Sequence, residues 1–584
     1  MQRTVVKISG ENGMGLSSVG EIIQKSLQKL GFYIHSEREF PSTIKGGKAC
    51  NNINISDEPI YGLSETIDIC IGLDREGVKD GLNTLKQGGI LIHGFERWNK
   101  IIKDLPTIVA EKELKVFLIP ARDIALENGG SLIMVNTVLV GFLWKVLNLD
   151  LGVLKDKITQ QFRKKPTLID VNIACLEAGY RYTTPEYNET FQPINLQPKP
   201  NQENTLLIDG NTALALGALQ GGMRNYVAYP MSPSTSILVY LAETSHKTGI
   251  SIKQAEDEIT AVQIALGAMH AGSRALVSTS GGGYDLMTET VSLAAMIETP
   301  LVVVNVQRPG PATGLPTWTA QGDVNLAIHS SHGEFARVVI SCSDPRDAYT
   351  NIQHAFNIAD VYQVPVIFLT EATIGMSQTT VPIFEQNTIP IERGLVSESE
   401  LVDLKSEYRY EITDTGISRR WLPTTSPATY FANGDEHWTS GELTEDADKS
   451  HTMLAKRLRK METILAELPD PEIFGVKSGA DISFVGFGSS KNAIEDIIHL
   501  YKKQGISVNY LHYTYLWPLK TSRFIEFCAN NAFVFGVEGN ATGQFITMLE
   551  EKSGVKCKAK LLKWDGRPFY IEDMEGLIQL NLKK

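Results

Sequence analysis

The chain of 584 residues contains little cysteine and no clustered metal-ligand motif. Its six cysteines include no C-x-x-C pair and are scattered over the chain: Cys50, Cys70, Cys175, Cys342, Cys528 and Cys557. Zinc and iron–sulfur sites need several thiolates close together, so we expect no metal site in this chain. Scattered cysteines without a signal peptide are typical of reduced, cytoplasmic proteins. If the protein catalysed a redox reaction, the electrons would have to leave through another subunit, because this chain has no cysteine cluster for an iron–sulfur centre.

The sequence also lacks an excess of basic residues and a long apolar run. Its net charge of −12 argues against a nucleic-acid-binding or membrane-binding surface, because both need a basic face. The longest apolar stretch, Leu132 to Trp144, is too short to span a bilayer and predicts a buried core or interface helix. The N-terminus leads directly into a predicted strand and has no apolar signal segment.

The length predicts three or four domains, and the pattern of strands and helices predicts an α/β fold in each large part. A segment with three prolines, many amides and little periodic hydrophobicity predicts a linker. Loop-like sequence and a charged helix then precede a last α/β region, which suggests a connector. The expected division is 1–187, the linker 188–204, 205–378, the connector 379–479 and 480–584.

Three polar clusters set into apolar sequence organise the region from Tyr229 to Thr317. The first is Tyr229–Ser236, the second is Gln254–Glu258 and the third is Arg308–Gly314. Each lies at an end of a short apolar run, where open α/β sheets bind their ligands. A hydroxyl, a carboxylate and a guanidinium at such an edge suit an anionic substrate that carries a carbonyl group.

The same region carries a family resemblance. The runs are YPMSPST from Tyr229, EDE from Glu256, TSGGGYDLM from Thr279 and RPGPATGLPT from Arg308. Together they resemble the α subunit of the 2-oxoacid:ferredoxin oxidoreductases, in the long form with a γ-type domain fused in front. The resemblance covers nearly the whole chain. It implies a multidomain α/β protein with a γ-type domain, a domain like the pyrimidine-binding domain of thiamine enzymes and a domain like the C-terminal domain of transketolase.

Glu258 is the candidate catalytic acid. Thiamine diphosphate becomes reactive through a tautomer of its aminopyrimidine, which a carboxylic acid at N1′ promotes, and burial beside an apolar helix raises the pKa of such an acid. Glu258 precedes the apolar segment Ile259–Met269, and the resemblance aligns it with the family's glutamate at N1′. Alternatively, the EDE run only supplies negative charge to a helix N-terminus.

The candidate substrate residues are Arg308, Ser232, Tyr229 and Thr313. The guanidinium of Arg308 can bind a carboxylate through two hydrogen bonds. Ser232 stands where the family commonly has threonine; its hydroxyl can still bind the substrate carbonyl or carboxylate, so the change bears on substrate preference. We therefore count Arg308 and Ser232 with Glu258 as catalytic. The alternative is that these residues only stabilise turns.

Two glycine elements near the N-terminus are candidate coenzyme A contacts by resemblance. Gly10, Gly13 and Gly15 follow a predicted strand, Val5–Ser9, and precede a helix, an arrangement that attracts phosphate. The dinucleotide-binding motif fails because it needs glycine at position 18, which is serine. The second element is Lys45, Gly46 and Gly47, with Lys48 beside it. Plain structural turns remain an alternative for both elements.

Half of the active site is absent from this sequence. We find no G-D-G…N element for a magnesium–diphosphate group and no cysteine cluster. In the resembled family both lie on a β subunit, so the resemblance implies an αβ or (αβ)2 assembly that shares thiamine diphosphate at its interface. The implied reaction is the coenzyme A-dependent oxidative decarboxylation of a 2-oxoacid, with 2-oxoglutarate expected, to acyl-CoA and CO2, with electrons passing to ferredoxin. Two alternatives are a non-oxidative transketolase-type enzyme and a catalytically degenerate scaffold.

Three further expectations concern local structure. Ser280–Gly283 is expected to be a glycine turn before a helix that starts at Asp285. The charged helix Asp446–Leu468 is expected to be an exposed arm or a connector. Asp435, Glu436 and His437 are not expected to bind a metal, because adjacent loop residues rarely converge on one ion.

Overall fold

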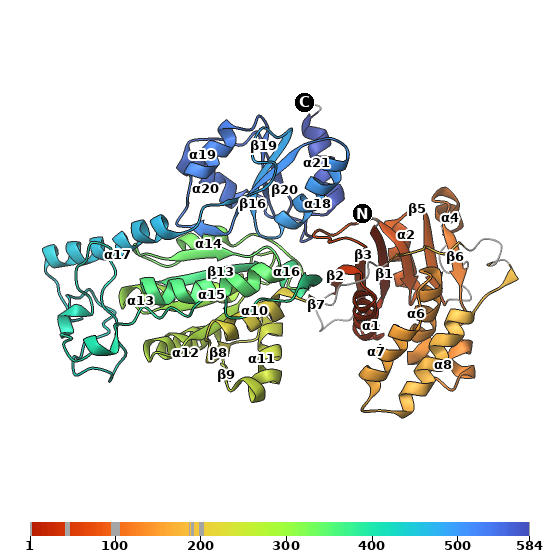
Figure 1. Ribbon diagram of the computed structural model, residues 1–584, viewed down its shortest axis with the longest axis horizontal. Helices are drawn as coiled ribbons and strands as arrows, with labels where there is room; N and C mark the ends of the chain where they lie inside the picture. The colour runs from red at the N-terminus through yellow and green to blue at the C-terminus, as the bar shows by residue number, and fades with distance from the viewer. Residues whose placement is uncertain are drawn as a thin grey trace. The chain divides into compact units, whose positions relative to one another are not determined.

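The computed structural model describes residues 3–40, 47–94, 105–185, 187, 192–197 and 204–582. The chain forms two compact units. The first contains Met1–Ile208, Ser377–Ile383 and Tyr570–Glu572, and the second contains Asp209–Met376, Phe384–Phe569 and Asp573–Lys584. Both units combine sheets with flanking helices, so the predicted α/β class is confirmed (Figure 1).

The first unit is built on an eight-stranded sheet in the order β6-β5-β4-β1-β3-β2-β14-β7. The strands β1, β4, β5 and β6 are parallel, whereas β3, β2, β14 and β7 pair antiparallel. The bounds are β1 Arg3–Glu11, α1 Leu16–Lys29, β2 Tyr33–Glu39, β3 Lys48–Ser56, β4 Ile67–Gly72, α2 Arg75–Thr84, β5 Leu85–His93, α4 Leu105–Glu111, β6 Lys115–Leu118, α5 Ala121–Glu127, η1 Leu132–Met134, α6 Val135–Val146, α7 Gly152–Phe162, α8 Thr167–Arg181, β7 Thr205–Ile208 and β14 Gln378–Pro382.

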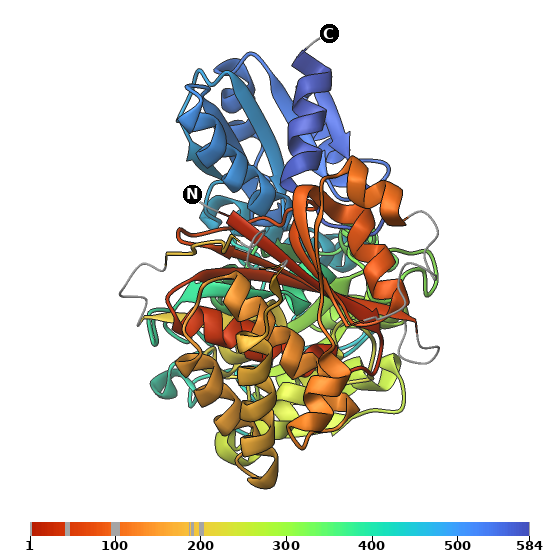
Figure 2. The same cartoon turned by 90° about the vertical axis from the view of Figure 1, so that its right-hand side faces the viewer.

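Both faces of this sheet are covered by helices. Alternate residues of β1 enter different cores: Val6 and Ile8 pack with the helices α1, α6, α7 and α8, and Val5 packs with α2. Figure 2 shows the two layers of helices on either side of the sheet. Nine of the twelve residues of α6 are buried, which confirms the prediction of a buried helix from the apolar run that begins at Leu132. One face of the strand, with Val6 and Ile8, thus builds the same core as the apolar helix α6.

The second unit contains a seven-stranded sheet in the order β18-β12-β13-β11-β10-β8-β9. All its strands are parallel except β18, which pairs antiparallel with β12. The bounds are α10 Gly210–Gln220, β8 Asn225–Ala228, α11 Thr235–Thr248, β9 Ser251–Gln254, α12 Glu258–His270, β10 Ala275–Thr279, α13 Gly281–Met296, β11 Leu301–Gln307, α14 Val324–His329, β12 Val338–Ser341, α15 Pro345–Tyr362, β13 Pro365–Glu371, α16 Ala372–Met376 and β18 Tyr515–Trp517. The central strands β10, β11 and β13 are buried along their whole length. The continuous apolar runs 301–306 and 364–369 predict this burial for β11 and β13.

The same unit contains a five-stranded sheet in the order β15-β17-β16-β19-β20, parallel except for β15. The remaining bounds are η2 Glu398–Glu400, η3 Ser406–Tyr408, α17 Ala447–Glu467, β15 Glu472–Gly475, β16 Ile482–Phe487, α18 Ser490–Lys503, β17 Val508–Tyr513, α19 Ser522–Ala529, β19 Val534–Glu538, α20 Gln544–Ser553, β20 Ala559–Leu562 and α21 Ile571–Leu582. Buried Gln321 joins the two sheets, because its side chain donates to Glu371 of β13 and to the carbonyl of Phe487 of β16, and accepts the amide of Gly539.

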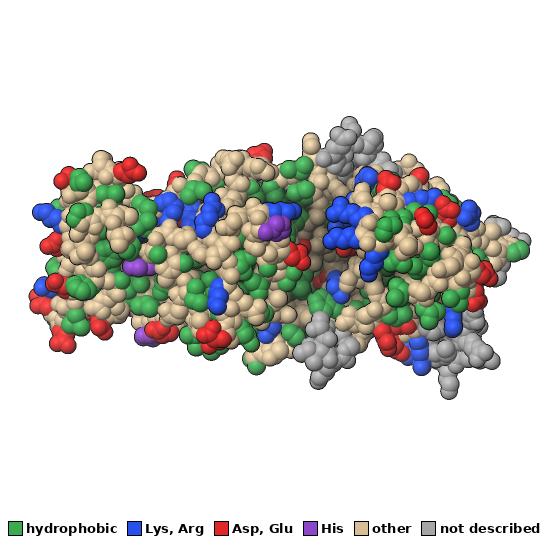
Figure 3. All heavy atoms as spheres, turned by 90° about the horizontal axis from the view of Figure 1, so that it is seen from below, with side chains coloured by type: hydrophobic (Ala, Val, Ile, Leu, Met, Phe, Trp, Pro, Cys, Tyr) green, Lys and Arg blue, Asp and Glu red, His purple; other side chains and the backbone are tan. Residues whose placement is uncertain are grey.

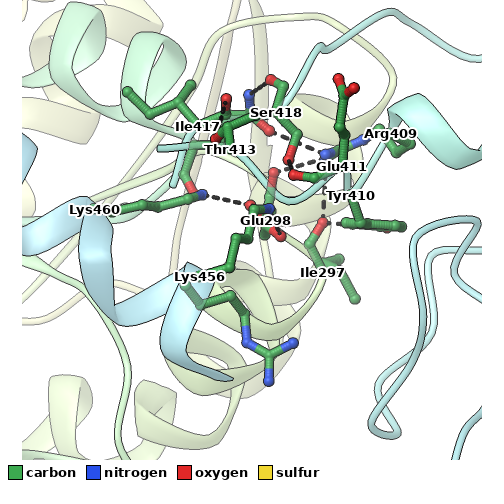
Figure 4. A network of polar contacts seen from close by, with 12 residues as sticks. Ile297, Glu298, Arg409, Tyr410, Glu411, Thr413, Ile417, Ser418, Lys456 and Lys460 are labelled. Carbon is green, nitrogen blue, oxygen red and sulfur yellow. Dashed lines mark hydrogen bonds and ion pairs between the residues drawn. The ribbon is translucent and has the colours of Figure 1, made fainter. Parts of the chain in front are cut away.

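The expectation of an exposed arm was wrong for α17. Lys456 and Lys460, which suggested a solvated helix, are buried because both pair with the fully buried Glu298, at 2.5 and 2.7 Å. Arg409 donates to the main-chain carbonyl of Glu298 at 2.8 Å, which joins the loop to the same cluster (Figure 4). Burial alone would raise the pKa of Glu298, and the two ammonium groups instead lower it well below its usual value.

The glycine turn expected at residues 280–283 was also wrong. The helix α13 begins at Gly281, with Ser280 at its N-cap. A Cβ at Gly281 would come within 2.5 Å of Asp323 Oδ2, and one at Gly283 would come within 2.8 Å of Glu258 Cγ. The glycines therefore allow two carboxylate side chains to approach the first turn of the helix.

Candidate active site

The three predicted polar clusters follow neighbouring parallel strands. Tyr229–Ser236 follows β8, Gln254–Glu258 lies at the end of β9, and Arg308 directly follows β11. The strands β9, β8, β10 and β11 are adjacent in the sheet. The clusters therefore lie at the carboxyl edge of one parallel sheet, where α/β folds bind ligands.

The three acids of the EDE run have different environments. Glu256 is exposed and accepts a hydrogen bond from the Thr260 hydroxyl at 3.2 Å. Asp257 caps α12 by accepting the Thr260 amide at 2.7 Å. Glu258, the first residue of the helix, is only 4 % exposed. Glu256 and Asp257 thus supply negative charge at the helix N-terminus, whereas Glu258 is the buried acid.

The carboxylate of Glu258 lies in a narrow space beside the first turn of α13. A side chain at Gly283 would collide with both the Glu258 carboxylate and the Thr279 hydroxyl. Within the described part of the chain, the buried Oε1 atom of Glu258 has no hydrogen-bond partner. A buried carboxyl oxygen without a partner is costly in a folded protein. The residue is therefore suited to bind a polar atom that another molecule supplies.

Arg308 and Ser232 are brought together by a main-chain contact. Nη1 of Arg308 donates to the carbonyl oxygen of Ser232 at 2.5 Å. This is the single hydrogen bond of the guanidinium among the described residues, so its other N–H groups can bind a carboxylate. Burial lowers the pKa of Arg308, and the neighbouring Asp323 opposes that shift. The arginine thus stays a cation at the edge of the sheet.

The other predicted substrate residues lie on the surface around this point. Ser232 and Thr313 are exposed, and their hydroxyl groups make no hydrogen bond with the described residues. Tyr229 is 38 % exposed. The structure places all three on the loops that follow β8 and β11, where a ligand at the sheet edge could reach them.

Sequence reasoning missed three polar residues beside Glu258 and Arg308. Asn305 donates to Asp323 Oδ2 at 3.1 Å, and burial raises the pKa of Asp323 to about 6. The buried Ser280 hydroxyl and the side-chain amide oxygen of Asn305 have no hydrogen-bond partner among the described residues. Asn305 could have been found from the sequence, because it is the one polar residue inside the apolar run 301–306. Asp323 gives no such signal, because its contacts are distant along the chain.

The two glycine elements of the first unit lie side by side. Glu11 pairs with Lys48 across β1 and β3, and the Asn12 amide donates to the Gly47 carbonyl at 2.8 Å. Gly10 is the next-to-last residue of β1, while Gly13 and Gly15 have φ angles of 101° and 78° before α1. The Lys48 ammonium is bound to Asp80. Lys45 and Gly46 lie outside the described residues.

The acidic loop at residue 435 is held by protein groups. Glu436 pairs with Arg457 at 2.6 Å, and the fully buried His437 contacts the carbonyl oxygens of Trp438 and Met296. Among the described residues, no group of three acidic, histidine or cysteine side chains could hold a metal ion.

In the described ranges, no helix is both long and apolar enough to cross a membrane. On the face drawn in Figure 3, basic side chains gather in small groups among acidic and apolar ones.

Comparison with known proteins shows the family. Residues 216–457 match the family model "Pyruvate flavodoxin/ferredoxin oxidoreductase, thiamine diP-bdg", and residues 5–182 match "Pyruvate ferredoxin/flavodoxin oxidoreductase". The 2-oxoacid:ferredoxin oxidoreductase subunit alpha of a Sulfolobus species is 30% identical, over 97% of this chain and 95% of its own. That of Saccharolobus solfataricus is 29% identical, over 99% and 97%.

A solved structure agrees over the whole length. The 2-oxoglutarate:ferredoxin oxidoreductase from Magnetococcus marinus, with 2-oxoglutarate, coenzyme A and succinyl-CoA bound, aligns with a TM-score of 0.91 at 27% identity and covers 100% of both chains. The buried glutamate at the sheet edge, the thiamine-binding family model and the full-length relatives lead to one conclusion. The chain belongs to the α subunits of the 2-oxoacid:ferredoxin oxidoreductases.

Proposed function

We propose that this chain, with a β subunit, catalyses the coenzyme A-dependent oxidative decarboxylation of 2-oxoglutarate to succinyl-CoA and CO2, with electrons passing to ferredoxin. The observation that carries the proposal is the buried Glu258 carboxylate, whose Oε1 has no partner among the described residues. The substrates bound to the Magnetococcus enzyme support the choice of 2-oxoglutarate and coenzyme A.

The residues at the sheet edge fit thiamine diphosphate. A carboxylic acid at N1′ of its aminopyrimidine needs a buried side chain with a free oxygen, and Glu258 has both. Ser280 and Asn305 add two buried polar atoms without partners in the described chain. When bound, thiamine diphosphate supplies a carbon nucleophile for the 2-oxo group and accepts the electron pair left by CO2. Glu258 would hold the proton at N1′.

Arg308 and Ser232 would bind the substrate. The free N–H groups of the Arg308 guanidinium would orient the carboxylate of the 2-oxoacid, and the Ser232 main chain keeps the guanidinium in place through the 2.5 Å bond. The exposed Ser232 hydroxyl, with Tyr229 and Thr313 nearby on the loops, would donate to the remaining oxygens of the substrate. Binding energy at the carboxylate would thus position the carbonyl carbon for reaction.

The β subunit would cover the outer face of α12 and α13. Ile259, Ile264 and Leu286 are 49, 37 and 52 % exposed on these two helices. Ile259 directly follows Glu258, so a chain that covers this apolar face would also close the space beside the carboxylate. No metal-binding group of side chains occurs among the described residues. As in the resembled family, the magnesium–diphosphate site and the iron–sulfur cluster would lie on β, in an αβ or (αβ)2 assembly.

Coenzyme A would bind to the first unit. The adjacent elements Gly10–Gly15 and Gly47 offer main-chain amides at the N-terminus of α1, which suit phosphate groups. A cavity of about 310 Å³ beside Gly15 is lined by apolar side chains that include Val19, Ile22 and Val140. Such a cavity would accept the uncharged arm of the coenzyme.

Co-expression with a candidate β subunit tests the proposal. The purified complex would be assayed for viologen reduction by 2-oxoglutarate, pyruvate and branched-chain 2-oxoacids, with and without coenzyme A. We expect reduction only when β, coenzyme A and 2-oxoglutarate are all present. Turnover without coenzyme A and without dye reduction would favour a transketolase-type enzyme. A complex that contains thiamine diphosphate and iron–sulfur but is inactive on every 2-oxoacid would indicate a scaffold.

A further inference from the structure

A second polar cavity lies in the second unit, apart from the proposed reaction site. Its volume is about 290 Å³, and it lies between α15, the loop that precedes β15, and the carboxyl end of β17. The charged and polar side chains at its wall include Lys491, Lys520, His354 and His512, together with three acids, Asp347, Asp470 and Glu472. None of the residues proposed for the reaction lines it.

His512 has one free nitrogen in this cavity. The residue is 2 % exposed, its Nδ1 lies 3.0 Å from the Tyr510 hydroxyl, and its Nε2 has no hydrogen-bond partner among the described residues. Ser490 donates its hydroxyl hydrogen to Phe487 at 2.7 Å, and the Tyr510–Ser490 distance of 3.4 Å is longer than that from Tyr510 to His512. Tyr510 therefore donates to Nδ1, which leaves the ring hydrogen on Nε2.

Lys491 provides a second buried donor at the same wall. Its side chain is 7 % exposed, and its ammonium lies 3.6 Å from Asp347 Oδ2 and 4.0 Å from Asp344 Oδ2. Both distances exceed a hydrogen bond, and the ammonium also lies 4.7 Å from the centre of the Phe474 ring. Asp344 is already bound by Arg346 at 3.1 Å. Burial lowers the pKa of Lys491, but the carboxyl groups of Asp347, Asp344 and Glu495 raise it more, so Lys491 is a cation whose N–H groups have no hydrogen-bonded oxygen among the described residues.

Two of the three acids near Lys491 have a raised pKa, whereas the pKa of Asp344 is lowered because Lys491 and Arg346 outweigh its burial. Burial raises the pKa of Asp347, and it raises the pKa of Glu495, one turn along α18, to about 7. Lys520, at the outer part of the cavity, pairs with the exposed Asp470 at 3.1 Å. Lys491 and His512 are thus the buried donors of the cavity, with Asp347 beside Lys491, while Lys520 and Asp470 lie at its more exposed part.

We propose that this cavity binds a small metabolite through an oxyanion group, a carboxylate or a phosphate, held by Lys491 Nζ and His512 Nε2. The two buried donors, an ammonium and an N–H group, suit an anion and not a cation at this end of the cavity. A volume of about 290 Å³ suits a small metabolite better than a nucleotide cofactor. Because α15 and β18 belong to the seven-stranded sheet region and β17 to the five-stranded sheet, a ligand here would bind both at once.

Calorimetric titration of the αβ complex at pH 7 tests the proposal, with inorganic phosphate and acetate as separate probes. The variants are His512→Phe, which removes the Nε2 donor, and Thr514→Val, a matched control at the same wall. Melting curves would verify that both variants fold. We expect saturable binding of at least one probe, at least tenfold weaker in H512F and unchanged in T514V. Phosphate bound at the coenzyme or diphosphate sites would not respond to H512F.

The two probes separate the sources of the oxyanion. Binding of phosphate alone assigns a phosphate ester, and binding of acetate alone assigns a carboxylate. A crystal of the complex grown with the bound probe should show it between Lys491 Nζ and His512 Nε2. Absence of binding by both probes, or equal binding by wild type and H512F, would overturn the proposal and indicate that ordered water fills the cavity.

Discussion

Two neighbouring glycines in the first turn of α13 give a matched pair of substitutions. A Cβ at Gly283 would collide with the Thr279 hydroxyl and lie 2.8 and 2.9 Å from Cγ and Oε1 of Glu258, whereas a Cβ at Gly282 meets no atom within 4 Å. Real Cβ atoms do not tolerate contacts this short, so Gly283→Ala must displace Glu258, Thr279 or the helix. Gly282→Ala adds a side chain in open space.

The expected changes in stability have opposite signs. Overpacking a buried site costs about 1–3 kcal/mol, so G283A should lower the melting temperature of the complex by a few degrees. Alanine in place of an unstrained helical glycine stabilises by about 0.5–1 kcal/mol, so G282A should be at least as stable as wild type. G283A should also lower kcat by more than its loss of stability explains, because Glu258 would move away from its productive position.

Differential scanning calorimetry of the two variants, with parallel activity assays, measures both effects. The pair controls for helix propensity, because each variant makes the same substitution in the same helical turn. If G283A were as stable and as active as wild type, the close packing of Glu258 against α13 would be refuted.

Three further predictions concern charged groups. Arg308→Ala should raise KM for the 2-oxoacid about 10- to 100-fold, since a hydrogen bond to a charged group contributes about 1.5–3 kcal/mol. Arg308→Lys should recover part of this loss. An unchanged KM in steady-state kinetics would show that Arg308 does not bind the substrate carboxylate. Glu298→Gln should destabilise the chain by about 3–5 kcal/mol in denaturant unfolding, because it leaves Lys456 and Lys460 buried without their anion; a wild-type midpoint would show that the cluster in Figure 4 contributes no net stability. Burial raises the pKa of Asp323 from 3.8 to about 6. Between these pH values the folded state therefore binds more protons than the unfolded state, so this group makes the stability fall as pH rises. In thermal unfolding, Asp323→Asn should show a shallower fall in stability from pH 4 to 6, and slopes identical to wild type would contradict the raised pKa.

The local sequence pattern was sufficient to predict a helix or strand that buries an apolar face. The helix α12 exceeds the apolar segment 259–269 by one residue at each end, and β8 and β11 are short apolar runs that precede two of the polar clusters, as expected. The same pattern separated Glu258 from Glu256, since only Glu258 adjoins the apolar face of the helix. These are properties of consecutive residues, which a sequence displays directly.

The predictions that failed concern residues whose environment depends on contacts with residues distant in the sequence. The burial of Lys456 and Lys460 depends on Glu298, about 160 positions away, and isolated from it the α17 sequence is typical of a solvated helix. Ser280–Gly283 resembles a loop until Asp323 and Glu258 are packed against it. The partner strands of β14 are β2 and β7, which lie in another part of the sequence. No local period reveals such pairs.

Glu258→Gln tests the central claim most directly, with Glu256→Gln as its control from the same acidic run. Both variants keep the size of the side chain, but glutamine at position 258 cannot hold an exchangeable carboxyl proton at N1′. In the αβ complex with β, thiamine diphosphate and coenzyme A, we predict that E258Q lowers kcat for 2-oxoglutarate-dependent viologen reduction at least about 100-fold. Assembly and melting temperature should not change, and E256Q should retain wild-type turnover. Wild-type turnover by an assembled E258Q complex would contradict the account.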